Sequence, residues 1–554
     1  MQKTKIKLNR NSLISFACVA VIILLFNLSM NWSAQPGFNW HKAFVAVLSV
    51  IAIAASPFLP TIFTALKKLF GREKTEENGL TQEKTDIFAP ENIFLVAVLI
   101  MGLSTMFILP KTIGYVMDDD THYIRSVSLV SLFDFVKYDT DTKMSEDYEA
   151  MVSFYNNMKP YDREFIRSYE KELSDLFKRE NSIYTNIFIH KGPEVQGYKT
   201  LLGAYDVAYI PQAFLMILAK GLHLPFAAVY IAGKLATLLT YAAVMYFSIK
   251  RLKYGKIMLS ILALIPTSVF LASGYGYDHF VYAFLIAGYS VFLSIMQDPE
   301  KKFKTKDMVL MYLFFVLSII PKWLYAFMVL PAFFIPADKF ESDKLKKTYR
   351  IVIASGAALA IAGCIFFLKK GGLGSGDPRG PEGINPLWQL LYITSEPVNS
   401  LGSVVRYYVS CFSTEGLKDI FCRYGYFGTG ILEPVIIIML FILAVFDGNP
   451  ENETKAKTDV VRWVTVGASV LMGVFICLAF YIIYTPFGAD TVYGVQGRYF
   501  IPMLFPFLYY AGSNTLKNKI TDRVPEKTIN MAMVAVMMII YYINLYVLYL
   551  SQFS

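Results

Sequence analysis

The feature of this sequence that most constrains its fold is a series of apolar runs, most of them long enough to cross a membrane, along its 554 residues. A transmembrane helix needs about 20 mainly apolar residues to cross the hydrocarbon core. Hydrophobic residues make up 55% of the chain and charged residues 17%, which is more apolar than a typical soluble domain. The sequence therefore predicts an all-α, multi-pass membrane protein.

The lengths of the runs predict about thirteen transmembrane helices. The expected spans are 12–30, 41–66, 90–110, 225–249, 257–274, 279–297, 307–320, 322–336, 348–368, 431–447, 462–484, 499–515 and 529–550. The Lys- and Arg-rich connections, such as 67–74, 250–256 and 344–350, all fall on one side of the membrane if the N-terminus is cytoplasmic and the C-terminus is outside. The expected compartment is a bacterial plasma membrane, and the lysine-rich composition, without organellar signals, favours a Gram-positive source.

The expected spans divide the chain into three regions. Residues 1–89 form an N-terminal addition of two helices and a cytoplasmic linker, 90–515 form the transmembrane core, and 516–554 form a cytoplasmic linker and the last helix. Two long outer loops, at about 111–224 and 369–430, belong to the core. Both loops are expected to carry interfacial helices.

One apolar segment, Tyr205 to Gly221, tests this topology. If it crossed the membrane, the basic segment 250–256 would lie outside and the charge pattern would break. We therefore interpret it as an interfacial helix on the outer surface, with a re-entrant helix as the alternative.

Three consecutive aspartates, Asp118, Asp119 and Asp120, follow the third expected span, and His122 and Arg125 come directly after them. Adjacent carboxylates cannot all ionise cheaply, so at least one pKa is expected to rise. Such a carboxylate can act as a general base, or the cluster can bind Mg²⁺ or Mn²⁺. The alternative is a hydrated turn that caps the next helix.

Three further polar groups are expected on the same outer face. Tyr277 and Asp278 occupy a short turn, Lys322 lies at the tip of a hairpin of two short spans, and Arg498 lies where a short loop enters a span. Lys can pair with a lipid phosphate, and Arg can bind two phosphate oxygens. The alternatives are a helix cap, a snorkelling lysine and an interfacial arginine. Acids and bases on one membrane surface favour a site for an anionic, lipid-linked substrate.

The five cysteines form neither a CxxC motif nor a zinc-like spacing with His. Cys411 and Cys422 lie in one outer loop. They either form a disulfide or are two unpaired small apolar residues.

Several short motifs carry a family resemblance. They are Asp118-Asp119-Asp120-Thr121-His122, then Tyr209 with Pro211 and Gln212, the Tyr277-Asp278 turn, Lys322, and Gln496 to Pro502. In this order they resemble the C-type (GT-C) glycosyltransferases, which use polyprenyl-phosphate sugars. More closely, they resemble a bacterial family of predicted membrane proteins of unknown function, over about residues 90 to 515. The sequence departs from that family's pattern at Asp119 and Asp120, which stand where Glu and Pro are usual, and at Lys322, which follows a proline.

The resemblance implies an inverting sugar transfer outside the cytoplasm. The donor would be an undecaprenyl-phosphate sugar, and the acceptor a cell-envelope glycan, a teichoic-acid-like polymer or a glycolipid. Asp118 or Asp119 would deprotonate the acceptor, while Arg498 and Lys322 would stabilise the leaving phosphate. No cofactor is required, although Mg²⁺ or Mn²⁺ is possible. The other expected substrate-binding residues are Asp120, His122, Arg125, Tyr209, Gln212, Tyr277, Asp278, Gln496 and Tyr499.

Three rival functions share many of these features. A flippase or exporter of lipid-linked glycans predicts charges in mid-span positions, which most of the expected spans lack; Lys234 is the clearest exception. A polymerase or ligase of lipid-linked chains differs only in its diphosphate donor. A non-catalytic scaffold predicts that Asp118 and Asp119 can be replaced without loss of function.

Overall fold

The computed structural model describes the chain in segments that cover most of the expected core. They are residues 88–109, 114–133, 168, 171–172, 175, 203–222, 224, 226–367, 381, 383–447, 455–511 and 526–550. The spans expected at 12–30 and 41–66 lie outside the described residues, as does nearly all of the expected N-terminal addition.

The described segments of the chain are mostly helical, and their only β structure is two isolated bridges. Within them, five helices are long and apolar enough to cross a membrane, and two shorter apolar helices, Trp323–Phe334 and Glu433–Ala444, accompany them. The five are Pro90–Ile108, Ala227–Arg251, Asp278–Met296, Val460–Ile483 and Thr528–Leu548. A multi-pass membrane protein is therefore confirmed in outline, whereas the count of thirteen and the orientation stay predictions.

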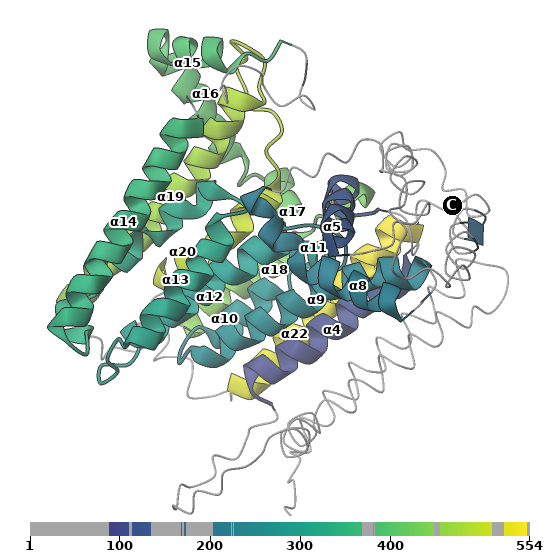
Figure 1. The fold of residues 1–554 in the computed structure, drawn as a ribbon, viewed down its shortest axis with the longest axis horizontal. Coiled ribbons are helices and arrows are strands. Elements are labelled where there is room, and N and C mark those ends of the chain that lie inside the picture. Colours follow the sequence, from purple (N-terminus) through teal and green to yellow (C-terminus); the bar gives the residue numbers. More distant parts are fainter. Residues whose placement is uncertain are drawn as a thin grey trace, which may run out of the picture.

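The centre of the bundle is α12 (Asp278–Met296) (Figure 1). Nearly all of its side chains are buried, as expected for a helix that is apolar on every side. It packs against α9 (Phe226–Arg251) and α13 (Thr305–Ile319). On the far side of α9 lies α4 (Pro90–Ile108), which also contacts α22 (Glu526–Leu550). This arrangement places the start of α12 at one end of the bundle.

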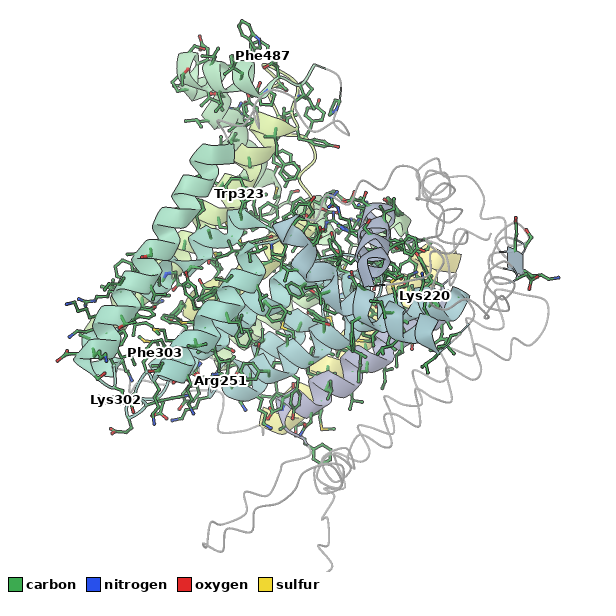
Figure 2. All side chains as sticks on the ribbon, viewed as in Figure 1. Lys220, Arg251, Lys302, Phe303, Trp323 and Phe487 are labelled. Atoms are coloured by element: carbon green, nitrogen blue, oxygen red, sulfur yellow. The ribbon has the colours of Figure 1, made fainter. Side chains whose placement is uncertain are left out.

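The expected hairpin around Lys322 is confirmed. It consists of α13 and the 3₁₀ helix η4 (Trp323–Phe334). The chain before α13 bonds to the chain after η4, because the Phe303 amide donates to the Lys339 carbonyl and the Glu341 amide donates to the Phe303 carbonyl. Phe303 and Trp323 accordingly mark opposite ends of the hairpin (Figure 2). Lys322 therefore lies at its tip.

The span expected at 257–274 is not one continuous helix. The structure has two short helices there, α10 (Lys256–Ala263) and α11 (Pro266–Ala272). Pro266 has no amide hydrogen to continue the first helix, and it begins the second. The break lets the turn after α11, residues 273–277, reach the end of the bundle where α12 begins.

The C-terminal half adds a second group of helices. Among them, α14 and α19 extend away from the rest of the bundle and lead to α15 and α16 at one extremity (Figure 1). The helix α17 packs against η8, which holds Arg498. The bounds are α14 Asp343–Phe367, α15 Pro386–Ser395, α16 Pro397–Ser410, α17 Thr414–Phe421, η7 Gly425–Phe427, α18 Glu433–Phe446, α19 Lys455–Ile483, η8 Gly497–Phe500 and α20 Ile501–Ala511.

The segment expected as an interfacial helix forms η3 (Ala204–Tyr209) and α8 (Ile210–Gly221), which pack against α5 (Asp119–Phe133). The buried face of α8 includes Gln212 and Met216. Its other face exposes Ile210, Phe214, Leu218 and Leu222. An exposed apolar face is typical of a helix that lies in the membrane interface, and the choice between an interfacial and a re-entrant helix stays a prediction.

The cysteines that can be described are free thiols, so Cys411 and Cys422 do not form a disulfide here. Cys422 is buried, and its thiol donates to the Ile431 carbonyl. Cys411 instead lies beside Cys477 of α19.

Candidate functional site

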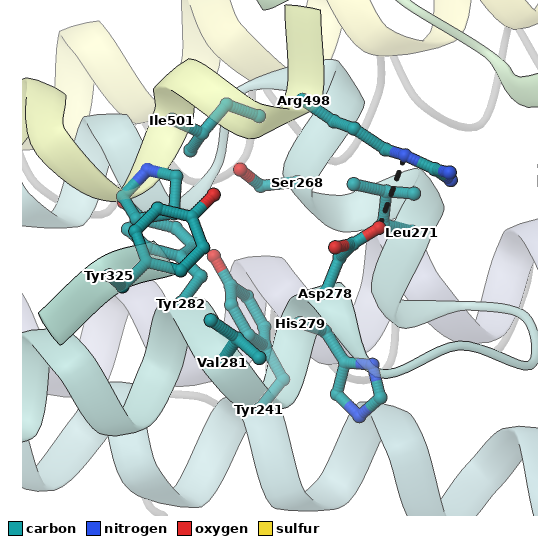
Figure 3. A pocket seen from close by; sticks show the side chains of 11 residues that line it. Tyr241, Ser268, Leu271, Asp278, His279, Val281, Tyr282, Tyr325, Arg498 and Ile501 are labelled. Carbon is teal, nitrogen blue, oxygen red and sulfur yellow. Dashed lines mark ion pairs between the residues drawn. The ribbon is translucent and has the colours of Figure 1, made fainter. Parts of the chain in front are cut away.

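Four charged side chains meet at the end of the bundle where α12 begins, and we call Asp118, Asp278, Lys322 and Arg498 the ion cluster. Nη2 of Arg498 lies 2.7 Å from Oδ2 of Asp118, and its Nε lies 3.1 Å from Oδ2 of Asp278. Nζ of Lys322 lies 2.8 Å from Oδ1 of Asp278. The pair between Arg498 and Asp278 is drawn in Figure 3. The structure thus brings together four residues that the sequence analysis placed on one face.

Both cations of the ion cluster are shielded from solvent. The side chain of Arg498 is 6% exposed and that of Lys322 is 15% exposed. Burial opposes the charge of Lys322, but Asp278, Tyr277 and other neighbours outweigh it and hold its pKa above the usual value. The same balance, led by Asp278, holds the pKa of Arg498 above its usual range. Both side chains therefore stay positively charged at neutral pH.

Asp118 is the most exposed member of the cluster, with 34% of its side chain open to solvent. Its backbone is left-handed, with a φ of 60°, which is uncommon for a residue other than glycine. Neighbouring loops hold this conformation: the Asp118 amide donates to the Tyr426 hydroxyl, and Arg498 donates to the carbonyl of Met117. An uncommon backbone held by several contacts at a charged surface is typical of functional sites.

Asp119 is fully buried and has a different environment from Asp118. Its carboxylate accepts hydrogen bonds from the amides of Tyr115, Val116 and Tyr275. Burial raises its pKa to about 6, opposed by Lys234 and by these amides. The expected rise is therefore found, but its cause is burial and not repulsion within the Asp triplet. Through these hydrogen bonds, Asp119 connects the loop before α5 with the turn before α12.

His122 anchors a second set of polar contacts beside the cluster. Its Nδ1 lies 2.7 Å from the Tyr209 hydroxyl, and its ring meets that of Tyr277 edge-on. Burial lowers its pKa to about 4, since the nearby carboxylates only partly oppose that effect, so the imidazole is neutral at pH 7. Gln212 accepts a hydrogen bond from Ser126 and donates to the Gly276 carbonyl. These contacts position α5 and α8 around the turn that precedes Asp278.

Tyr499 supports Lys322. Nζ of Lys322 lies 3.8 Å from the centre of the Tyr499 ring, and Phe480 stacks on Tyr499. Tyr277 provides a second ring, 5.3 Å from Nζ. Cations are attracted to aromatic faces, so these tyrosines position the ammonium group. Little of Tyr499 is open for stacking on a sugar, since it is 9% exposed.

Three other expected site residues lie outside the ion cluster. Arg125 pairs with Asp206 at 3.3 Å and lies over the Tyr205 ring. Gln496 precedes the η8 turn, and its buried Oε1 has no hydrogen-bond partner among the described residues. The side chain of Asp120 lies outside the described residues.

Two residues that complete the site were not singled out from the sequence. Asp419 on α17 accepts a hydrogen bond from the Gly497 amide at 2.5 Å, next to Arg498, and also pairs with Arg423. Tyr426 accepts from the Asp118 amide and donates its own amide to the Tyr115 carbonyl. Tyr426 lies within the segment Arg423 to Gly430, and Asp419 lies just before it. The many Gly and Tyr residues of this segment are the only sequence feature that could have pointed to it.

A small cavity lies beside the Asp278–Arg498 pair and extends the polar region into the bundle (Figure 3). Tyr241, Ser268, Tyr282 and Tyr325 bring hydroxyl groups to its lining. The Tyr282 hydroxyl and His279 Nδ1 have no hydrogen-bond partner within the described residues.

The acids of the site are already paired with cations or amides. Asp118 and Asp278 face Arg498 and Lys322, and Asp119 faces backbone amides. The described residues contain no group of three or more His, Cys, Asp or Glu that could hold a metal ion.

Residues 99–506 match the model of a family described as predicted membrane proteins (DUF2142). The match covers well over half of the sequence and includes all four residues of the ion cluster. The chain belongs to this family. No curated protein and no solved structure matches it. The expected resemblance to a family of predicted membrane proteins is thereby confirmed, and the resemblance to GT-C glycosyltransferases stays a prediction.

Proposed function

We propose that this protein is a membrane glycosyltransferase that moves a sugar from a polyprenyl-phosphate donor to an acceptor on the extracytoplasmic face. The acceptor would be an envelope glycan, a teichoic-acid-like polymer or a glycolipid. The observation that supports this proposal is the ion cluster, in which a partly exposed carboxylate lies 2.7 Å from a buried guanidinium. A base and a cationic phosphate site side by side are what a displacement at a sugar phosphate needs.

In the proposed reaction, Asp118 removes the proton from an acceptor hydroxyl. The acceptor oxygen then forms a bond to the anomeric carbon as the bond from that carbon to the phosphate oxygen breaks, with inversion. The polyprenyl phosphate leaves with the electron pair of that bond, and negative charge grows on its oxygen. Arg498 and Lys322 stabilise that charge, which lies in a region of low dielectric constant.

Asp118 is the preferred base because it is accessible. Asp119 is enclosed and accepts three backbone amides, so a proton transfer to it would disrupt the loop that it holds. His122, neutral and bonded to Tyr209, is assigned a positioning role. Asp278 holds both cations in place for the phosphate.

The exporter alternative receives less support from the contacts of Lys234. This mid-span cation is 1% exposed and lies over the rings of Tyr115 and Tyr230, close enough to Asp119 to lower its pKa. A residue enclosed in this way stabilises the fold and does not line a path for a glycan.

The test compares the surface glycans of four strains. One is a strain from which the gene has been deleted, and the other three are the same strain carrying the native chain, the Asp118→Asn variant or the Asp343→Asn variant. Asp343 is a control because its side chain is 94% exposed and pairs only locally with Lys346. We expect one sugar or branch to disappear in the deletion and to return with the native chain and the control, but not with Asp118→Asn, at equal membrane levels. Full restoration by Asp118→Asn would refute the assignment of the base. An unchanged glycan in the deletion would refute sugar transfer.

A further inference from the structure

A stripe of exposed apolar side chains runs along α16 and just past its end. It consists of Val398, Leu401, Val405, Val409 and Phe412, all of them more than 40% exposed. These residues are three or four positions apart, so they lie on one face of the helix. The opposite face, with Ser400, Ser403 and Val404, is buried against the protein. The polar side chains of α16 therefore lie against the protein or along the side of the helix, and its apolar stripe faces away from the protein.

The position of α16 on α19 explains what the stripe faces. One line of residues on α19 is exposed in its first half, at Trp463 and Val470, and a side chain at Gly467 would meet open space. Because α19 is long and apolar enough to cross the membrane, we expect this exposed line to face lipid.

The same line continues toward the end of α19 through Gly473 and Cys477, each three or four residues further on. There α16 covers it: Tyr408 packs against Gly473, and Cys411 lies beside Cys477. In this region α16 occupies the place that lipid has along the first half of α19. The stripe, on the far side of α16 from α19, then continues the lipid-facing surface.

We propose that the α16 stripe contacts the hydrocarbon of the lipid leaflet on the side of the ion cluster, so that α16 is a membrane-embedded helix and does not belong to a water-exposed loop. The stripe contains no charged residue, while Asn399, Arg406 and Ser410 lie on the flank of the helix. This inference does not depend on the proposed function.

The test uses the full chain in lipid vesicles, with the native cysteines replaced by alanine and a nitroxide attached to one introduced cysteine. The labelled positions are Val405 on the stripe, Leu471 on the exposed face of α19, and Glu415, whose side chain is 78% exposed. We expect the labels at Val405 and Leu471 to collide more often with oxygen, which dissolves in lipid, than with a water-soluble nickel complex. The label at Glu415 should behave in the opposite way. A label at Val405 that favours nickel, or that neither reagent reaches because protein covers it, would overturn the proposal.

A second comparison needs no cysteine replacement. Val405→Asp places a charge on the stripe, and Ser410→Asp places the same charge on the flank of the same helix. We expect Val405→Asp to lower the melting temperature in vesicles by several degrees and Ser410→Asp to leave it nearly unchanged, because a charge that faces lipid is costly. Equal melting temperatures for the two variants would contradict lipid contact at the stripe.

Discussion

Asp118 and Arg498 lie at opposite ends of the family match, yet their side chains form an ion pair of 2.7 Å. Arg498 also reaches Asp278, so one guanidinium connects the loop before α5 to the first turn of α12. A planar group with donors on several nitrogens can serve two carboxylates at once, whereas an ammonium on a flexible stem cannot hold this geometry. The identity of this residue, and not only its charge, is therefore expected to matter.

Arg498→Lys tests this expectation. The variant keeps the positive charge but cannot bridge Asp118 and Asp278, so we expect sugar transfer to fall by about 100-fold or more. The assay is restoration of the missing glycan in deletion cells. Arg251→Lys is the matched control, because Arg251 at the end of α9 forms a similar pair, at 2.6 Å, with Asp307 in the first turn of α13. Equal restoration by both variants would refute a special role for the guanidinium.

Asp119→Asn and Asp118→Asn are expected to fail in different ways. An asparagine at 119 keeps one acceptor oxygen but brings an NH₂ group toward backbone amides, so the buried site loses hydrogen bonds at a cost of about 1–3 kcal/mol. We expect a lower melting temperature and less protein in the membrane. Asp118→Asn, at a partly exposed position, should keep its melting temperature while losing activity. A melting temperature for Asp119→Asn equal to that of the native chain would contradict the structural role.

The sequence alone predicts the pairing partners poorly, although it identifies the residues well. The sequence singles out the four residues of the ion cluster because charged residues at the ends of apolar runs are costly unless they form pairs or serve a function. Sequence spacing carries no information on which of two adjacent aspartates is buried. That choice depends on the amide of Tyr275, which lies in the turn between α11 and α12.

The supporting loop illustrates a second limit of sequence reasoning. Asp419 and Tyr426 act through contacts with the backbone of Gly497, Asp118 and Tyr115. Contacts with backbone atoms leave no chemical pattern in the sequence of the partner, so neither residue could be assigned in advance. The hairpin tip at Lys322 was predictable because two short apolar runs flank one polar break.

Gly425 is expected to be required in this loop. Its φ is +52°, and a side-chain carbon added there would lie 2.0 Å from the carbonyl oxygen of Tyr115. Gly425→Ala should therefore displace the loop that supports Asp118, lowering both stability and glycan restoration. Gly467→Ala is the control, since a side chain at that helical position meets open space. Native behaviour of Gly425→Ala would show that the loop can shift without harm.

The neutral state of His122 predicts a pH dependence. Its pKa is about 4 in the folded protein and about 6.5 when unfolded. The unfolded chain alone takes up this proton as the pH falls from 6.5 to 4, so the native protein loses stability across that interval, by on the order of 3 kcal/mol at most. His122→Gln cannot titrate. We expect the difference in melting temperature between the native chain and His122→Gln to shrink as the pH falls through this window and to stay constant above pH 7. A difference independent of pH would mean that His122 is not buried as a neutral group.

Asp278 connects the two cations, and a double-mutant cycle can measure that connection. Asp278→Asn leaves Lys322 buried without its carboxylate, whereas Arg498 keeps Asp118. Breaking a buried pair from one side costs about 3–5 kcal/mol, because the remaining charge stays uncompensated.

Adding Lys322→Met to Asp278→Asn removes that uncompensated charge, so we expect the double variant to melt at a higher temperature than Asp278→Asn alone. The exposed pair of Lys346 and Asp343 provides the comparison cycle, with an expected coupling below about 1 kcal/mol. If the two cycles gave the same coupling, Lys322 would have to be solvated in the folded protein. The cluster would then be a group of surface charges, with no low-dielectric environment to strengthen its hold on a phosphate.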